Sequence, residues 1–145
     1  MTEFLWTIEA LSQAMMAKTV GSLPKGITGI SIDTRTLQPG EAYFAIKGDV
    51  HDGHKFVANG HAAGAAVSVV AEDWLDRLEG KTGPLLVVDD VLEALERLGI
   101  AARARTNARI VAVTGSVGKT TTKEALRTAL APSGSVHAEI GRAHV

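Results

Sequence analysis

The segment TGSVGKTT, from Thr114 to Thr121, contains residue types that could bind the phosphates of a nucleotide. Its two glycines, Gly115 and Gly118, allow the backbone to turn tightly and to approach a phosphate without a clash from a Cβ atom. An apolar strand is expected before the loop, over 109–114, and a helix after it, over 119–130. Because loop N–H groups and a helix N-terminus both carry partial positive charge, this arrangement predicts an anion-binding site.

Two side chains of the loop could act directly on a bound nucleotide. Lys119 is the candidate catalytic residue, because it would neutralise charge on the β- and γ-phosphates of ATP. The hydroxyl of Thr120 is the candidate ligand of Mg2+. The full set of expected ATP-binding residues is Gly115, Ser116, Val117, Gly118, Lys119, Thr120 and Thr121. The alternative is a plain strand-to-helix turn with a solvated Lys119, but Gly-Lys-Thr after an apolar strand favours phosphate binding.

This loop is shorter than the general phosphate-loop pattern, G-x-x-x-x-G-K-[ST]. Only Ser116 and Val117 lie between the first glycine and the Gly-Lys pair. The loop alone does not identify the phosphoryl acceptor, because kinases, ATPases and ligases share such loops.

Upstream of the loop, helix and strand patterns alternate, which predicts an α/β fold. The expected helices cover 8–16, 54–63 and 90–104, and the expected strands cover 27–32, 42–46, 66–70 and 85–88. Thr7 is expected to cap the first helix, Asp89 or Asp90 the third, and Trp6 to pack on Leu11. The side chains expected to face inward are Ile8, Leu11, Met15, Phe56, Val57, Gly60, Ala63, Val91, Leu95, Leu98, Ala102, Leu126, Ala129 and Leu130.

The predicted organisation is a small N-terminal α/β substrate-binding domain over 1–89, followed by the truncated start of a parallel-sheet phosphate-loop ATPase domain over 90–138. One strand and one helix cannot complete a sheet, so we expect residues from about Asp90 onward to be poorly ordered in isolation. The last residues, 139–145, continue no pattern, and a common sequencing-adapter oligonucleotide encodes EIGRAHV in one frame. We therefore expect a non-native tail there.

Composition excludes several classes of protein. With 46% hydrophobic and 21% charged residues, the chain resembles a soluble globular protein. A formal net charge of −1 gives no indication of a nucleic-acid or membrane partner. The chain has no cysteine, which suits a reducing cytoplasm, and its N-terminus has no signal-peptide or membrane-span pattern.

The longer segment TGSVGKTTTKE, over 114–124, resembles the ATP loop of the Mur ligases, a family of bacterial cell-wall synthesis. Three N-terminal segments resemble the substrate-recognition domain of the same family in order and spacing. They are SIDTR at 31–35, PGEAYFAIKG at 39–48 and HDGHKF at 51–56. Since the resemblance covers nearly all of residues 1–138 and includes two separate motifs, the chain is identified as a member of this family.

Within the family, Ser116 and the Lys123-Glu124 pair favour the ligase that adds D-alanyl-D-alanine to UDP-N-acetylmuramoyl-tripeptide. The ligase that adds the third residue, a diamino acid, is the alternative and typically carries Thr-Asn in place of Ser116-Val117. The resemblance implies that ATP and Mg2+ convert a carboxylate to an acyl phosphate, which the dipeptide amine then attacks. It also implies further acidic metal ligands, a modified lysine and a dipeptide-binding domain beyond this chain, so we expect this chain alone to be inactive. We expect a monomer.

The resemblance also implies that the N-terminal domain holds the uridine diphosphate end of the substrate. The residues expected to do so are Ser31, Asp33, Thr34, Arg35 and Lys47. Hydroxyls suit uracil or ribose, a guanidinium and an ammonium suit a diphosphate, and Asp33 could orient Arg35 or accept from a ribose hydroxyl. Alternatively, Asp33 and Thr34 only shape the turn, and Arg35 only pairs with Asp33 or Glu41.

Other interpretations remain open from the residues. His51, Asp52 and His54 could suggest a metal site, but an Asp52 cap before a helix is the simpler interpretation. Trp6 and Trp74 have the character of packing residues. The remaining classes are a small kinase, which should lack the motifs of 33–56, and a module that binds a UDP-sugar without catalysis.

Overall fold

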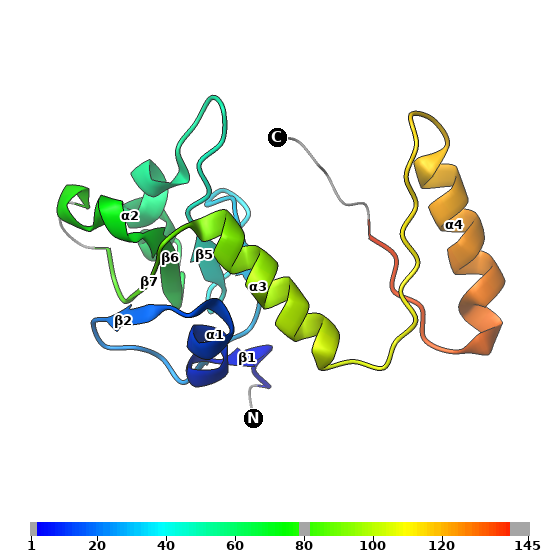
Figure 1. Cartoon of the computed structure of the whole chain (residues 1–145), viewed down its shortest axis with the longest axis horizontal. Helices are drawn as coiled ribbons and strands as arrows, with labels where there is room; N and C mark the ends of the chain where they lie inside the picture. Colours follow the sequence, from blue (N-terminus) through cyan, green and yellow to red (C-terminus); the bar gives the residue numbers. More distant parts are fainter. Residues whose placement is uncertain (1–2, 79–81, 140–145) are drawn as a thin grey trace. The chain divides into compact units, whose positions relative to one another are not determined.

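The computed structural model describes residues 3–78 and 82–139 (Figure 1). The chain forms two compact units, Met1–Thr106 and Asn107–Val145. Within the described residues, no helix is long and apolar enough to cross a membrane.

A five-stranded sheet with the order β2-β7-β6-β5-β4 forms the centre of the first unit. Its strands are β2 (Lys18–Val20), β4 (Ile30–Ser31), β5 (Ala42–Phe44), β6 (Val67–Ala71) and β7 (Leu85–Val88). Strands β4 to β7 are parallel, and β2 pairs with β7 in the antiparallel sense. A separate antiparallel pair joins β1 (Trp6–Thr7) to β3 (Gly26–Ile27).

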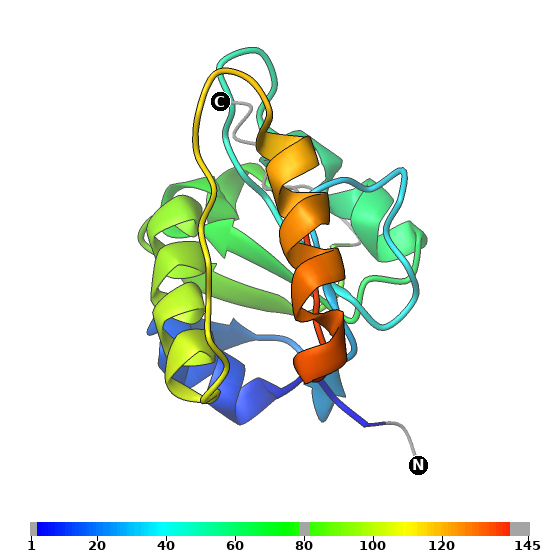
Figure 2. The ribbon, with the colours of Figure 1, turned by 90° about the vertical axis from the view of Figure 1, so that its right-hand side faces the viewer.

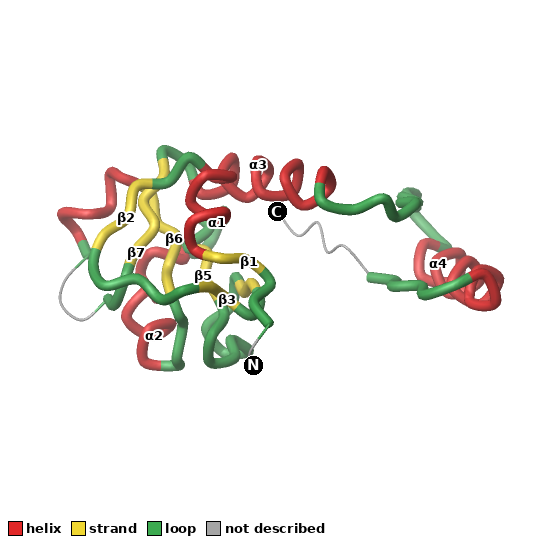
Figure 3. The backbone as a smooth tube through the Cα atoms, turned by 90° about the horizontal axis from the view of Figure 1, so that it is seen from below, coloured by secondary structure: helices red, strands yellow, loops and turns green. Residues whose placement is uncertain are grey.

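Helical segments cover both faces of this sheet (Figures 2 and 3). On one face lie α1 (Ile8–Met15) and α3 (Val91–Ala104), whose buried side chains share a cluster with Phe44, Val69 and Leu86. On the other face lie α2 (Val57–Ala62) and the 3-10 segment η2 (Glu72–Arg77). There Val57 and Leu75 pack with Tyr43 and Val87. The predicted α/β class is confirmed, and burial on both faces explains why β5 to β7 read as apolar runs.

Local capping signals place the helices where the sequence predicts them. The Thr7 hydroxyl accepts from the N–H of Ala10 at 3.2 Å. The Asp90 carboxylate accepts from the N–H of Glu93 at 2.9 Å and starts α3. Trp6 and Leu11 are both buried in one hydrophobic cluster, in accord with the expected packing.

Three expectations about elements of the first unit need correction. The strand expected over 27–32 is two short strands, because Ile27 pairs with Trp6 in one sheet and Ile30 with Ala42 in the other. The helix expected over 54–63 begins as a 3-10 turn, η1 (Gly53–Phe56), before α2. Three side chains expected inside, Phe56, Ala63 and Ala102, are exposed, whereas His54 and Ala94 are buried.

The helix that follows Asp89 belongs to the first compact unit. Val91, Ala94 and Leu98 of α3 are buried in the same cluster as α1. The Arg97 guanidinium donates to the carbonyl of Met15 at 3.0 Å, and that of Arg105 lies 3.9 Å from the ring centroid of Trp6. The compact units divide after Thr106, and the predicted domain boundary near Asp89 stays a prediction.

The second unit contains α4 (Lys119–Leu130), with the predicted bounds, and the 3-10 turn η3 (Ala131–Ser133). The strand expected over 109–114 is not formed, and Ile110 and Val111 are more than 60% exposed. The reason is that no neighbouring strand is present among residues 107–139. For the same reason Leu126, Ala129 and Leu130 are not buried. Of the expected tail, 139–145, only Glu139 lies within the described residues.

Candidate functional site

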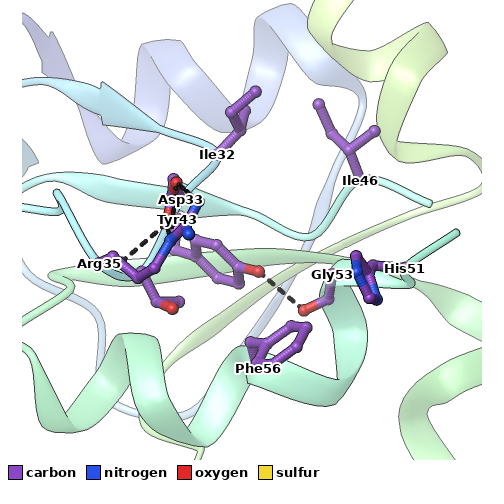
Figure 4. A pocket seen from close by; sticks show the side chains of 9 residues that line it. Ile32, Asp33, Arg35, Tyr43, Ile46, His51, Gly53 and Phe56 are labelled. Carbon is purple, nitrogen blue, oxygen red and sulfur yellow. Dashed lines mark hydrogen bonds and ion pairs between the residues drawn. The ribbon is translucent and has the colours of Figure 1, made fainter. Parts of the chain in front are cut away.

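The chain emerging from β4 and β5 lines a cavity of about 430 Å³ (Figure 4). The lining residues are Ile32, Asp33, Thr34, Arg35, Tyr43, Ile46, His51, Gly53 and Phe56. Asp33 and Arg35 lie at one side of this group and His51 and Ile46 at the other, with Ile32, Tyr43 and Phe56 between them (Figure 4). The cavity thus combines a charged end with an apolar middle, a combination that suits a ligand with both a ring and an anionic group.

The charged end is organised by a two-residue turn. Oδ1 of Asp33 accepts from the backbone N–H of Arg35 at 2.9 Å. The carboxylate also accepts from Nε of Arg35 at 2.9 Å and from Nη2 at 2.7 Å. This guanidinium lowers the pKa of Asp33 to about 2. Asp33 therefore stays ionised at neutral pH and holds Arg35 at the mouth of the cavity.

The floor of the cavity depends on Tyr43, which is 1% exposed. Its hydroxyl donates to the carbonyl of Gly53 at 2.8 Å and so links β5 to η1. A Cβ atom on Gly60 would lie 3.2 Å from the tyrosine ring, so the missing side chain there lets α2 pack closely. Burial, together with the negative charges of Asp33 and Asp52, raises the pKa of Tyr43 to about 12.

We expect the Tyr43 hydroxyl to ionise near pH 12 in the folded protein and near its ordinary value of 10.0 after unfolding. Because the folded-state pKa is the higher one, this group stabilises the fold fully below pH 10.0 and loses that contribution as the pH rises through about 12. Tyr43 is the only tyrosine, so tyrosinate absorbance reports on it alone. A folded-state midpoint close to 10 would contradict the buried hydroxyl.

His54 lines a second cavity and is only 4% exposed. Its Nδ1 lies 2.6 Å from Oδ1 of Asp52, and its Nε2 accepts from the N–H of Ala71 at 2.9 Å. These contacts indicate a neutral ring protonated at Nδ1. The ring stacks on Trp74 with centroids 5.0 Å apart, and the Arg77 guanidinium lies 5.4 Å from the Trp74 centroid. His54 therefore acts as a buried connector between η1 and the end of β6.

Asp52 caps η1, as the sequence predicts, by accepting from the N–H of His54 at 3.0 Å. Partial burial acts to raise the pKa of Asp52, but hydrogen bonds from the backbone and ring of His54 outweigh it and lower the pKa overall. The second cavity, about 380 Å³, lies at the carboxyl ends of the central strands. Its lining includes Lys47, Asp52, His54 and Trp74.

The residues expected to bind a uridine diphosphate are only partly brought together. Asp33, Thr34 and Arg35 line the first cavity. The Ser31 hydroxyl instead donates to the carbonyl of Asp33 at 3.0 Å and shapes the turn. Lys47 lines the second cavity, so it lies apart from the cavity that contains Arg35.

Six lining residues of the first cavity were not anticipated as site residues: Ile32, Tyr43, Ile46, His51, Gly53 and Phe56. They belong to the same polar segments as the expected site residues, but their types suggest packing or turns. No signal in the sequence separates them from packing residues, because the exposure of Phe56 becomes visible only in the structure. An arginine over each tryptophan, Arg77 on Trp74 and Arg105 on Trp6, was likewise not visible in the sequence.

In the second unit, the phosphate loop precedes α4 with features that suit an anion. Gly115 and Gly118 have φ angles of 146° and 79°, in the region that favours glycine. No side chain caps the N-terminus of α4, and its first turn has no acidic residue. The N–H groups of that turn are therefore not satisfied by a capping side chain, in contrast to those of α1 and α3. The side chain of Val117 is 92% exposed and projects from the loop.

A family model described as "Mur ligase family, catalytic domain" matches residues 26–103. The chain belongs to the Mur ligase family. The match includes the whole of the first cavity and most of the central sheet.

Curated relatives show which members of the family the chain is similar to. A UDP-N-acetylmuramoyl-tripeptide–D-alanyl-D-alanine ligase from Synechocystis sp. is 40% identical over 111 residues, which is 77% of this chain and 24% of the relative. The enzyme of the same name from Bacillus subtilis is 36% identical over the same shares. A UDP-N-acetylmuramoyl-L-alanyl-D-glutamate–2,6-diaminopimelate ligase from Syntrophomonas wolfei is 37% identical over 83% of this chain and 24% of the relative. The chain thus spans about a quarter of the length of these relatives.

Solved structures agree with this placement. A structure of MurF from Acinetobacter baumannii is 36% identical and has a TM-score of 0.73 over 88% of this chain and 28% of that one. MurF ligase from Thermotoga maritima in complex with ADP is 27% identical, with a TM-score of 0.61 over 78% of this chain and 25% of that one.

Proposed function

We propose that this chain is part of an ATP-dependent ligase that adds D-alanyl-D-alanine to UDP-N-acetylmuramoyl-tripeptide in the cytoplasm. Family membership and the relatives of that name support this proposal. The observation that carries it is the first cavity, where a charged Asp33–Arg35 end adjoins an apolar wall that contains Phe56.

The first unit would bind the uridine diphosphate end of the substrate. The uracil ring would lie against Phe56 and the neighbouring isoleucines, since flat rings gain from apolar and aromatic contact. The diphosphate would lie toward the Arg35 guanidinium, and the Thr34 hydroxyl would serve the ribose or the base. Ser31 would act by shaping the turn rather than through direct contact.

The second unit would bind ATP through the loop from Gly115 to Thr121. The uncapped first turn of α4 and the loop N–H groups would hold the phosphates. Lys119 would neutralise charge that develops on the transferred phosphoryl group. A hydroxyl ligand suits Mg2+, so Thr120 would hold the ion, which supplies further charge neutralisation on the phosphates.

In the proposed reaction, the terminal carboxylate of the tripeptide attacks the γ-phosphorus of ATP and ADP leaves. The amine of D-alanyl-D-alanine then attacks the resulting acyl phosphate, an amide forms and phosphate leaves. This chain contributes substrate and nucleotide binding, and we propose that it does not ligate by itself. We expect it to be a monomer.

The alternative member is the ligase that adds the third residue, and the 37% identity to a diaminopimelate ligase is the observation that favours it. Expression of the gene that encodes this segment, read past the codon for Ala138, allows a direct test. ADP release that requires both UDP-N-acetylmuramoyl-tripeptide and D-alanyl-D-alanine is expected. ADP release that responds instead to UDP-N-acetylmuramoyl-dipeptide and a diamino acid would replace the proposal with the alternative.

A binding measurement on this chain separates the broader classes. We expect calorimetric titration to detect UDP and UDP-N-acetylmuramoyl-tripeptide, and Arg35→Ala to weaken both by about tenfold because a charge-assisted contact is lost. Lys55→Ala, an exposed cation outside the cavity lining, is the matched control. Binding of Mg-ATP without UDP would favour a kinase, and binding of UDP by a full-length protein without ADP release would favour a simple binding module.

A further inference from the structure

We propose that Asp33 is a positioning residue, which holds one edge of the Arg35 guanidinium so that the opposite edge is presented to the diphosphate of the ligand. The inference rests on the proposed function, because it assigns the diphosphate to the Arg35 end of the first cavity. It concerns how that end is organised before the ligand arrives.

The argument begins with the donors of the guanidinium. Arginine has five N–H donors in a fixed plane. The Asp33 carboxylate accepts from Nε at 2.9 and 3.2 Å and from Nη2 at 2.7 Å. These contacts occupy the edge that contains Nε. The second Nη2 donor and one Nη1 donor form the other edge, which has the geometry that binds two phosphate oxygens at once.

The turn lets residues close in sequence hold Arg35 in place. Oδ1 of Asp33 also accepts from the Arg35 backbone N–H at 2.9 Å, so one carboxylate orders both the main chain and the side chain of Arg35. The Ser31 hydroxyl donates to the Asp33 carbonyl and accepts from the Asp33 N–H at 3.2 Å, which fixes the turn from the other side. Arg35 is 87% exposed by side-chain area, so no packing would order it in the absence of Asp33.

Two opposing effects follow from a carboxylate at this place. Its negative charge repels a diphosphate, whereas its contacts remove rotamer freedom that Arg35 would otherwise lose on binding. The repulsion is screened at this exposed position. The ordering therefore prevails, and removal of the Asp33 charge should weaken diphosphate binding even though it removes a like charge.

The test compares UDP with uridine, which lacks the diphosphate, in calorimetric titrations of the whole chain. We expect Asp33→Asn to weaken UDP binding about fivefold and to leave uridine binding unchanged, since ordering of one long side chain is worth about that much. Asp49→Asn, an exposed carboxylate outside the cavity lining, should leave both unchanged. In the Arg35→Ala background, Asp33→Asn should have no further effect on UDP binding.

A spectroscopic measurement makes the result independent of affinity. The Nε–H of Arg35 should give a slowly exchanging NMR signal in the parent protein that Asp33→Asn removes, while the backbone spectrum away from the turn is retained.

Equal or tighter UDP binding by Asp33→Asn would overturn the inference and leave the proposed function intact. An equal loss in the Arg35→Ala background would also overturn it, because Asp33 would then contact the ligand itself. Failure of the parent chain to bind UDP or uridine would overturn both.

Discussion

Replacement of His54 by alanine is expected to destabilise the first unit by about 3 kcal/mol. The ring is almost fully buried, and its loss leaves the N–H of Ala71 without an acceptor and removes the ring hydrogen bond to Asp52. It also opens a space beside Trp74, whose ring stacks on that of His54. Urea denaturation monitored by tryptophan fluorescence measures this free energy of unfolding directly.

His51→Ala provides the matched control, because His51 is an exposed histidine three residues earlier in the chain. We expect it to change the free energy of unfolding by less than about 0.5 kcal/mol. If His51→Ala and His54→Ala destabilise equally, the hydrogen bonds of His54 do not contribute to stability as described.

Gly53→Ala is expected to destabilise the same unit by about 2–3 kcal/mol and to lower its melting temperature by about 10 °C or more. A Cβ atom there would lie 2.8 Å from the carbonyl oxygen and 2.9 Å from the nitrogen of Ile46. Both are backbone atoms, so the segment that follows β5, or η1 itself, must shift to accommodate the methyl group. The shift would also move the Gly53 carbonyl away from the Tyr43 hydroxyl and so weaken the hydrogen bond between them.

Gly99→Ala is the matched comparison, because the same substitution should here increase the free energy of unfolding. Gly99 lies within α3, and an added Cβ atom would have no heavy atom within 4 Å. Alanine is preferred over glycine inside a helix, so we expect stabilisation by about 0.5–1 kcal/mol. Calorimetric melting curves that show Gly53→Ala to be neutral, or Gly99→Ala to be destabilising, would contradict the packing described for these segments.

Elements with strong local signals could be predicted from the sequence. Residues 85–88 form an apolar run bounded by Gly83-Pro84 and the Asp90 cap, and β7 has the bounds that this pattern predicts. Similarly, α4 starts at Lys119 because the preceding glycine turn ends at Gly118, whose left-handed backbone forms the N-cap of the helix. Each of these segments contains the information for its own boundaries.

Features that depend on distant partners could not be predicted. The segment 27–32 divides because Ile27 and Ile30 pair with different sheets, which a strand pattern alone does not reveal. His54 is buried because its Nε2 meets a backbone N–H seventeen positions along the chain, at Ala71. The segment 109–114 is apolar like β6, yet forms no strand without neighbouring strands, since hydrogen bonding between strands is a property of the sheet.

In the candidate site, too, the local motif could be predicted and the features that depend on distant segments could not. The polar motif that contains Asp33, Thr34 and Arg35 was visible in the sequence, and these residues line one cavity. The apolar wall was not, because Phe56 has the spacing of a buried helix residue. Its exposure arises because the chain enters α2 through a 3-10 turn, which changes the direction of the side chain relative to a regular helix.

The short outer strands of the central sheet bear on self-association. Its two outermost strands, β4 and β2, have only two and three residues. Unpaired backbone at a sheet edge is a template for another chain, and short edges with charged side chains offer little of it. Lys18 places such a charge on β2, where it forms an ion pair with Glu72 at 2.8 Å. Edge-to-edge aggregation is therefore disfavoured, so the first unit should tolerate the high concentrations that crystallisation and NMR require.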